Sequence, residues 1–151
     1  MTQIIPDRDK QKLKEILEQE LTGDVNIAVL TQPGSAGLIV PGMPQRAYAE
    51  TEQLLREVAE LSPKVKLQVF NVQAEPQRLE EYSVAETPAI VFGVDGKRNL
   101  RYFGFPGGGE FSALLRDMVR VSQKDSEVDE KARPMVDALP PIHVEVFVTP
   151  T

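Results

Sequence analysis

The hydrophobic residues follow two spacings along the chain, and each spacing predicts one type of secondary structure. Apolar residues recur every three or four positions over 7–21, over 45–61 and again after Gly109, which predicts three amphipathic helices. A short polar segment at 75–82 predicts a fourth. Short apolar or alternating runs predict strands at 25–31, 65–71, 89–92 and 99–103.

The connections between these segments predict how the strands pair. The helix at 45–61 joins the first two strands, so those strands are expected to be parallel with a right-handed crossover. Asp95-Gly96 is a two-residue hairpin signal, which makes the last two strands antiparallel. The element order therefore predicts an α/β fold, with a mixed four-stranded sheet and helices on both faces.

The C-terminal part of the sequence predicts two further elements. Ser126 and Asp129 resemble a capping box that opens a short helix, and Pro134 must then bend or shorten it. In residues 142–148, branched apolar residues (Ile142, Val144, Val146 and Val148) alternate with His143, Glu145 and Phe147, which predicts one more strand. An unpartnered strand exposes backbone hydrogen-bonding groups, so we expect it to pair with the edge of its own sheet or with a second copy of the chain.

The loop at 32–44 is rich in Gly and Pro and cannot be regular helix or sheet. Its place before a helix N-terminus would suit a phosphate, but it lacks the GxxxxGK spacing and a nearby lysine. Leu38, Ile39 and Val40 are three consecutive apolar residues within it. They either cover the sheet edge or contact a partner.

Composition and charge exclude several classes of function. The 151 residues suit one domain with its own core. The formal net charge is -6, with Lys and Arg scattered among acids, so we expect no nucleic-acid partner. No apolar run approaches the roughly 18 residues of a membrane span, and no signal-peptide pattern is visible. We therefore expect no membrane contact and a cytoplasmic location.

The sequence contains no cysteine and a single histidine, His143. A disulfide, a thiolate nucleophile, an iron–sulfur cluster and a cysteine-based zinc site are thereby excluded. A serine nucleophile would need His143 as its base, but that residue lies in the predicted strand at 142–148 and is interpreted as part of its polar face. We predict no catalytic residue, no metal site and no cofactor.

Three segments carry a resemblance to a known family. ETPAIVF, in which Thr87-Pro88 enters a strand, resembles the cis-proline segment of the thioredoxin superfamily. RYFGFPGGGEF and VFVTPT are similar to segments of the tandem protein disulfide oxidoreductases, also called glutaredoxin-like proteins, of thermophiles. The resemblance implies a thioredoxin-like fold with an extra N-terminal helix and an extra C-terminal helix and strand. It places a first unit at 1–123, and at 124–151 a linker helix plus the first strand of a following unit.

The resemblance also implies where the active site of such a unit would lie. The two cysteines of a Cys-x-x-Cys pair would fall at about Gln45 and Tyr48, and neither residue is a redox nucleophile. In the family, the backbone before the cis-proline pairs with an extended substrate peptide. Carried over, Glu86 and Thr87 would offer that edge beside Pro88. The alternative interpretation is that Pro88 only shapes a turn of the core.

Three functions follow as hypotheses. The first is a redox-inactive unit that is retained for architecture and for docking a protein or a second thioredoxin-like unit. The second is an N-terminal fragment of an active thiol-disulfide oxidoreductase whose Cys-x-x-Cys begins just after Thr151. The third is a free-standing binding module that uses the groove near Pro88. A homodimer through the strand at 142–148 is a further expectation about partners.

Overall fold

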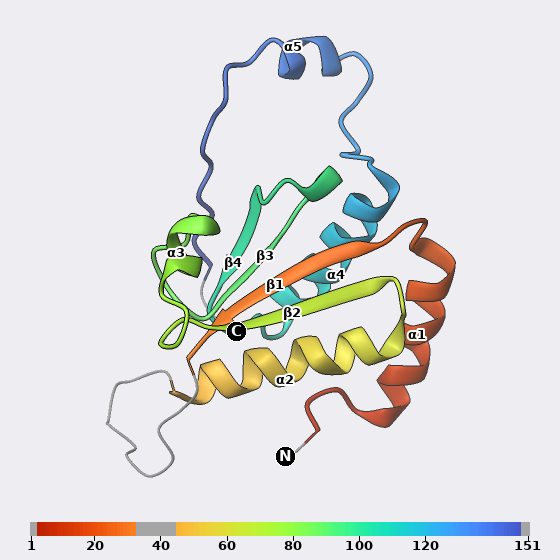
Figure 1. Cartoon of the computed structure of the whole chain (residues 1–151). Coiled ribbons are helices and arrows are strands. Elements are labelled where there is room, and N and C mark those ends of the chain that lie inside the picture. The colour runs from red at the N-terminus through yellow and green to blue at the C-terminus, as the bar shows by residue number, and fades with distance from the viewer. Residues whose placement is uncertain (1–2, 33–44, 149–151) are drawn as a thin grey trace.

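The computed structural model describes residues 3–32 and 45–148 (Figure 1). The predictions for Leu38, Ile39, Val40 and Thr151, and for the rest of the loop at 33–44, lie outside these residues. The elements in chain order are α1 (Asp7–Glu20), β1 (Val25–Thr31), α2 (Gln45–Leu61), β2 (Val65–Asn71), α3 (Gln77–Glu81), β3 (Ala89–Phe92), the 3-10 turn η1 (Val94–Gly96), β4 (Leu100–Phe103), α4 (Gly109–Gln123) and α5 (Arg133–Asp137).

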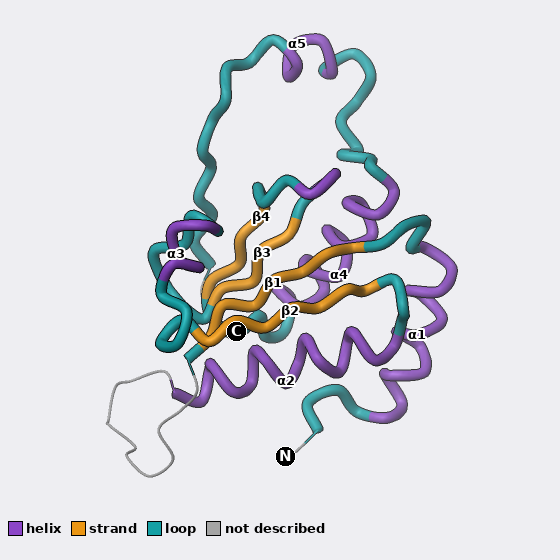
Figure 2. The backbone as a smooth tube through the Cα atoms, in the orientation of Figure 1, coloured by secondary structure: helices purple, strands orange, loops and turns teal. Residues whose placement is uncertain are grey.

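The four strands form one mixed sheet in the order β2-β1-β3-β4, as Figure 2 shows. β1 and β2 are parallel, with Val25 opposite Val65, and α2 forms the crossover between them. β3 is antiparallel to both β1 and β4. The predicted mixed four-stranded sheet is confirmed, and the pairing follows from the connections as the sequence indicated.

The two faces of the sheet are covered unequally. One face packs against α1, α2 and α4, and alternate strand residues such as Val29, Ile90 and Phe92 form the main core there. The opposite face is covered by α3 and the segments around it, through a smaller cluster that includes Leu30 and Tyr82. Each strand residue therefore faces one of two layers according to the two-residue period.

The segment before α1 is tied to α2 by one buried carboxylate. Glu57 is 3% exposed and accepts hydrogen bonds from the backbone N–H groups of Ile4 and Ile5, both at 2.9 Å. Burial raises the pKa of the Glu57 carboxyl, but hydrogen bonds from Gln53, Ile4 and Ile5 and the charge of Lys10 outweigh it. Together they lower that pKa from 4.5 to about 2. Glu57 therefore stays ionised and fixes the position where α1 begins.

The hairpin between β3 and β4 forms, but with a longer connection than the sequence predicted. Phe92 pairs with Leu100, so residues 93–99 lie between the paired strands rather than two turn residues. Asp95 and Gly96 both have positive φ, 53° and 74°, as residues of a tight hairpin turn do. The dipeptide thus turns the chain at the predicted place, within a wider loop.

Two predictions for the C-terminal part are wrong. Ser126 does not cap a helix: α5 begins only at Arg133, and Pro134 lies in its first turn, where the missing N–H of proline costs nothing. Residues 142–148 form no strand within the described part of the chain, because none of the strands there pairs with them, and their side chains are exposed. The expected pairing with the edge of the chain's own sheet is therefore also wrong. Figure 1 shows residues 124–148 as an arm that leaves α4 and passes around the sheet.

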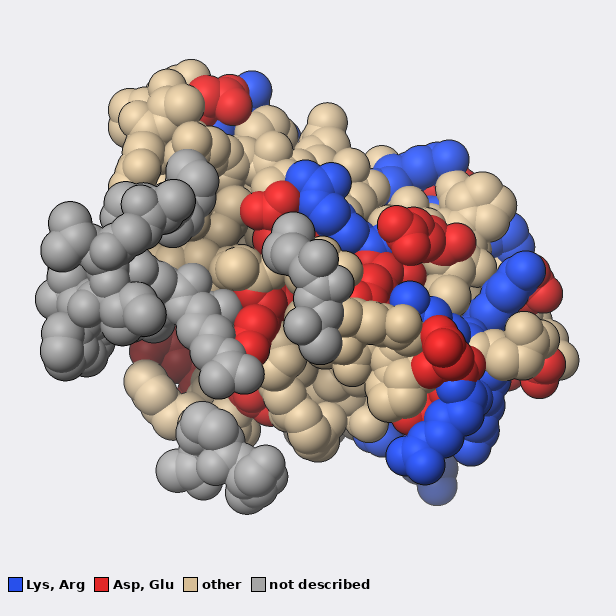
Figure 3. Space-filling model, turned by 90° about the horizontal axis from the view of Figure 1, so that it is seen from below, with Lys and Arg blue, Asp and Glu red and all other residues tan. Residues whose placement is uncertain are grey.

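The surface mixes charges of both signs. In Figure 3 the Lys and Arg side chains of the face shown are interspersed with Asp and Glu. Among the described residues, no helix combines the length and the apolar character that a bilayer-spanning segment needs.

Candidate functional site

The candidate site lies where three segments meet beyond the end of β1. Gln32 directly follows β1, Tyr48 lies in the first turn of α2, and Thr87 immediately precedes Pro88 and β3. The parallel β1–α2–β2 unit places the start of α2 near this end of the sheet. The antiparallel pairing of β3 with β1 brings the start of β3 to the same end, since Ala89 lies opposite Leu30.

The Thr87 side chain links the three segments. The Gln32 amide donates a hydrogen bond to the Thr87 hydroxyl at 3.1 Å, and the Thr87 hydroxyl donates to the Tyr48 hydroxyl at 3.4 Å. All three side chains are half-buried, so the contacts lie at the surface and are partly open to solvent. The arrangement offers hydroxyl and amide groups that can bind a polar backbone, and no thiol.

Pro88 is buried, and the peptide bond between Thr87 and Pro88 is cis, the isomer that the resemblance implies for this position. The Pro88 carbonyl accepts a hydrogen bond from the Gly104 N–H at 2.9 Å. The Gly104 carbonyl in turn accepts a hydrogen bond from the buried hydroxyl of Thr51 at 3.4 Å. Tyr48 and Thr51 are three residues apart on one face of α2, so this helix contacts both Thr87 and the turn at Gly104 that is hydrogen-bonded to Pro88.

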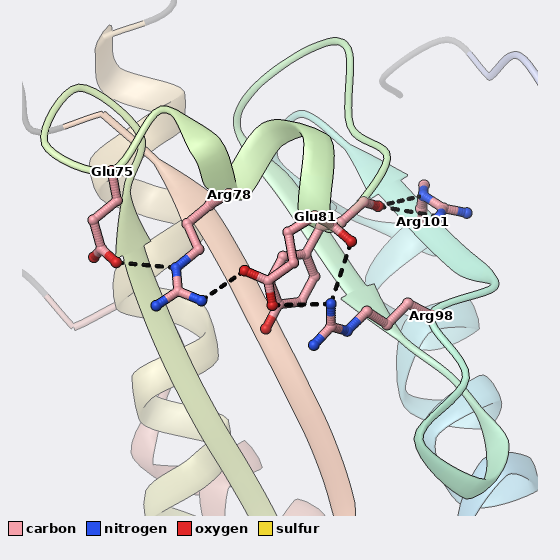
Figure 4. Close-up of polar contacts among 6 residues, drawn as sticks. Glu75, Arg78, Glu81, Arg98 and Arg101 are labelled. Atoms are coloured by element: carbon pink, nitrogen blue, oxygen red, sulfur yellow. Dashed lines mark hydrogen bonds and ion pairs between the residues drawn. The ribbon is translucent and has the colours of Figure 1, made fainter.

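The loop at 82–87 is held against β4 by a cluster of charged residues around α3. Arg98 donates hydrogen bonds to the side chain and the backbone carbonyl of Glu81, and Arg101 donates two to the Tyr82 carbonyl (Figure 4). The Arg98 guanidinium also lies 3.9 Å from the centre of the Tyr82 ring. Hydrogen bonds from Arg78 and Arg98 lower the pKa of the Glu81 carboxyl, with the bond from Arg78 contributing more. These contacts hold the Tyr82 end of the loop that carries Glu86 and Thr87, and the hydrogen bond from Gly104 to Pro88 holds the other end.

The structure brings some of the predicted residues together and not others. Tyr48 and Thr87 are in contact, and Glu86 is exposed beside them. Gln45 is the first residue of α2, but its side chain lies outside the described residues. Gln32 belongs to the site although no sequence pattern assigned it an individual role; its place directly after a buried strand was the available signal.

The described residues bring neither a histidine nor a metal-binding cluster to this site. His143 lies on the arm, 77% exposed, with its Nε2 2.9 Å from the Glu145 carboxylate. Within 3–32 and 45–148, no group of three or more His, Asp or Glu residues is arranged to hold a metal ion. The hydroxyl and amide groups of Gln32, Tyr48 and Thr87 can take part in hydrogen bonds with a bound molecule.

No protein-family model matches the chain, and no curated protein matches it. Several solved structures, however, do match the chain. The protein disulfide oxidoreductase of Aeropyrum pernix superposes with a TM-score of 0.73 at 20% identity, over 89% of this chain and 55% of that one. The alkylhydroperoxide reductase AhpF of Enterococcus faecalis gives a TM-score of 0.72 at 21% identity, over 90% of this chain and 61% of that one.

A separate structure of the N-terminal domain of that reductase gives 0.70 at 21% identity, over 91% of this chain and 62% of that one. The predicted thioredoxin-like fold is confirmed by these similarities. The chain spans between 55% and 62% of the length of these three solved chains.

Proposed function

We propose that this chain is a redox-inactive thioredoxin-fold domain that binds an extended peptide segment of a partner protein at the loop before Pro88, within a protein of the disulfide oxidoreductase type. One observation carries the proposal: the Tyr48 hydroxyl contacts Thr87, at the place where the resemblance puts a cysteine. Disulfide exchange needs a thiolate, and a tyrosine hydroxyl cannot replace it. What remains of such a site is its capacity to bind.

The geometry of the loop supports peptide binding. Glu86 is exposed, Thr87 is half-buried, and the loop that carries them is tied to β4 at Pro88 and to the arginine cluster through Tyr82. A fixed loop loses little conformational entropy when an extended peptide pairs with its backbone, which favours recognition by strand addition.

Two measurements test the proposal. The isolated chain is expected to give no dithiol-dependent reduction of insulin disulfides above the thiol-reagent background, and turnover above it would refute redox inactivity. S-alkylated insulin B chain, labelled with a fluorophore, serves as the extended peptide. Thr87→Arg is expected to abolish its binding, whereas Ala113→Arg, on an exposed position of α4, leaves binding unchanged. Equal binding by the two variants would mean that Pro88 only shapes the core.

A second candidate function is that of an N-terminal unit, 1–123 followed by a linker at 124–151, of an active oxidoreductase. The chain covers 55% of the Aeropyrum pernix oxidoreductase, and VFVTPT resembles the strand that precedes Cys-Pro-Tyr-Cys in that family. The codons after Thr151 decide: a Cys-x-x-Cys supports this candidate, and a stop codon removes it.

The arm offers a route to self-association for either candidate. The side chains of Val144, Val146 and Phe147 are 70%, 80% and 88% exposed, and the alternating pattern at 142–148 would suit strand pairing with a second copy. Sedimentation is expected to show a concentration-dependent dimer, and Val146→Pro, which removes a ladder N–H, is expected to shift it to monomer. A monomer at all concentrations would contradict this pairing.

A further inference from the structure

An apolar groove runs along α1 and α4, away from the site at Thr87. It has a volume of about 790 Å³ and shares no lining residue with that site. Its walls are formed by half-buried or exposed apolar side chains of both helices and of the turn before α4: Leu13, Ile16, Phe105, Phe111, Leu115 and Val119. Contiguous apolar surface of this kind, left open on a folded chain, marks a binding surface.

The two helices that form the groove are parallel and joined at their C-terminal ends. The Gln123 amide donates a hydrogen bond to the Glu20 carbonyl at 2.9 Å, and the Ser122 hydroxyl accepts from the N–H groups of Thr22 and Gly23. The other end of the groove is closed by Ile4 and the turn at 105–108. The groove therefore extends along the 14 residues of α1, a length of about 21 Å at the rise of an α-helix.

The charged side chains on the rim are balanced in number, three acidic and three basic, but they are not all paired. Asp9 lies 3.6 Å from Arg8, Glu20 accepts a hydrogen bond from Gln123, and Glu127 is paired with Arg120. Lys12 and Arg116 also line the groove, one from each helix. Within the part of the chain that the structure describes, neither has an ion pair or a side-chain hydrogen bond. Two unpartnered positive charges thus border an apolar surface.

We propose that the groove between α1 and α4 binds an acidic amphipathic helix of a partner protein. The apolar face of that helix fills the groove, and its flanking Asp or Glu side chains pair with Lys12 and Arg116. A groove about 21 Å long has room for roughly four turns of an α-helix lying along it. An amphipathic helix would place its apolar stripe against the groove and keep its polar face in solvent.

The probe for this proposal is a synthetic helical peptide of about 15 residues with leucines at i, i+4 and i+7 spacing and glutamates beside them. A second peptide has lysine in place of each glutamate. Fluorescence anisotropy is expected to show the glutamate peptide binding the chain at least about tenfold more tightly than the lysine peptide. Backbone NMR shifts are expected on α1 and α4, and not at 86–88, which separates this site from the proposed peptide site.

Charge reversal tests the role of the rim. The double variant Lys12→Glu/Arg116→Glu is expected to invert the preference between the two peptides. Lys66→Glu/Lys97→Glu changes the net charge equally on the opposite face of the sheet and is expected to leave the preference unchanged. All four positions are exposed, so the variants are expected to fold.

Several outcomes would overturn the proposal. Equal binding of both peptides, or no binding of the glutamate peptide, would remove the acidic helix as occupant. Self-association that Leu115→Glu abolishes would assign the groove to a second copy of the chain. Binding of palmitate in place of the peptide, lost in the same variant, would assign it to an acyl chain.

Discussion

The hydroxyl groups of Tyr48 and Thr87 lie 3.4 Å apart, which joins the first turn of α2 to the residue before Pro88 across 39 positions of sequence. The Thr87 hydroxyl is the centre of this contact, since it also accepts a hydrogen bond from Gln32. In this thioredoxin-like fold, a tyrosine hydroxyl therefore joins α2 to the loop before Pro88, and the chain contains no cysteine.

Removal of the two hydroxyls is expected to have unequal costs. Thr87→Val removes both hydrogen bonds and should lower the free energy of unfolding by about 1 kcal/mol, while Tyr48→Phe removes only the longer one and should cost less than about 0.5 kcal/mol. Urea unfolding of the two variants beside the unchanged chain measures the difference. Equal costs would mean that the hydrogen bond from Gln32 to Thr87 contributes nothing measurable to stability.

Introduced cysteines provide a direct test of where the active site of a redox-active relative would lie. In Gln45→Cys/Tyr48→Cys the two thiols are three residues apart at the start of α2, within the reach of a disulfide. The unchanged chain has no thiol, so a thiol assay has no background. We expect the double variant to lose both free thiols on mild oxidation, and to regain them with dithiothreitol.

The matched control for this pair is Gln45→Cys/Ala49→Cys, whose second thiol lies one position further along the helix. Disulfide formation that is equally fast in both pairs would contradict the assignment of Tyr48 to the second cysteine position.

The sequence correctly predicted those helices and strands whose apolar positions are also buried in the folded chain. The helices at 7–21 and 45–61 and the strands within the sheet all have an apolar face that the tertiary structure buries, so periodicity alone located them. Residues 142–148 have the same alternation and form no strand, because a strand needs a neighbouring backbone as well as a pattern. Ser126 is likewise a residue type that favours the N-cap position, but no helix begins beside it, since α5 starts at Arg133.

The candidate site was predictable in part, for a similar reason. The positions of Tyr48, Thr87 and Pro88 followed from a resemblance that fixes them relative to the sheet. The link through Gln32 and the support of the loop by Arg98 and Arg101 depend on side chains from separate segments that meet only in the folded chain. Sequence spacing carries no information on such contacts.

Glu57 is expected to make the free energy of unfolding depend on pH in the acidic range. Its pKa is about 2 in the folded chain against 4.5 for an ordinary glutamate, so its ionised form contributes about 3 kcal/mol above pH 4.5, and this contribution is lost as the pH falls through 4.5 towards 2. Glu57→Gln should therefore lower the free energy of unfolding by about 2–3 kcal/mol at pH 7. Near pH 2 the difference from the unchanged chain should largely disappear.

Urea unfolding of both proteins at several pH values measures this dependence. Glu60→Gln, on an exposed position of the same helix, is the control and is expected to change stability by less than about 0.5 kcal/mol at any pH. A loss in Glu57→Gln that stays constant between pH 7 and pH 2 would show that the side-chain shape, and not its charge, holds Ile4 and Ile5.

The end of β1 beside the candidate site contains a buried hydroxyl that we expect to weaken the fold. Thr31 is 3% exposed, and its Oγ1 has no hydrogen-bond partner among the described residues. A buried hydroxyl without a partner costs about 1–3 kcal/mol, so Thr31→Val, which keeps the shape, should raise the free energy of unfolding by about 1 kcal/mol. Thr31→Ser keeps the hydroxyl and loses a methyl group, so it should be destabilising by about 1 kcal/mol. Urea midpoints that fall in both variants would show that the Thr31 hydroxyl is satisfied in solution.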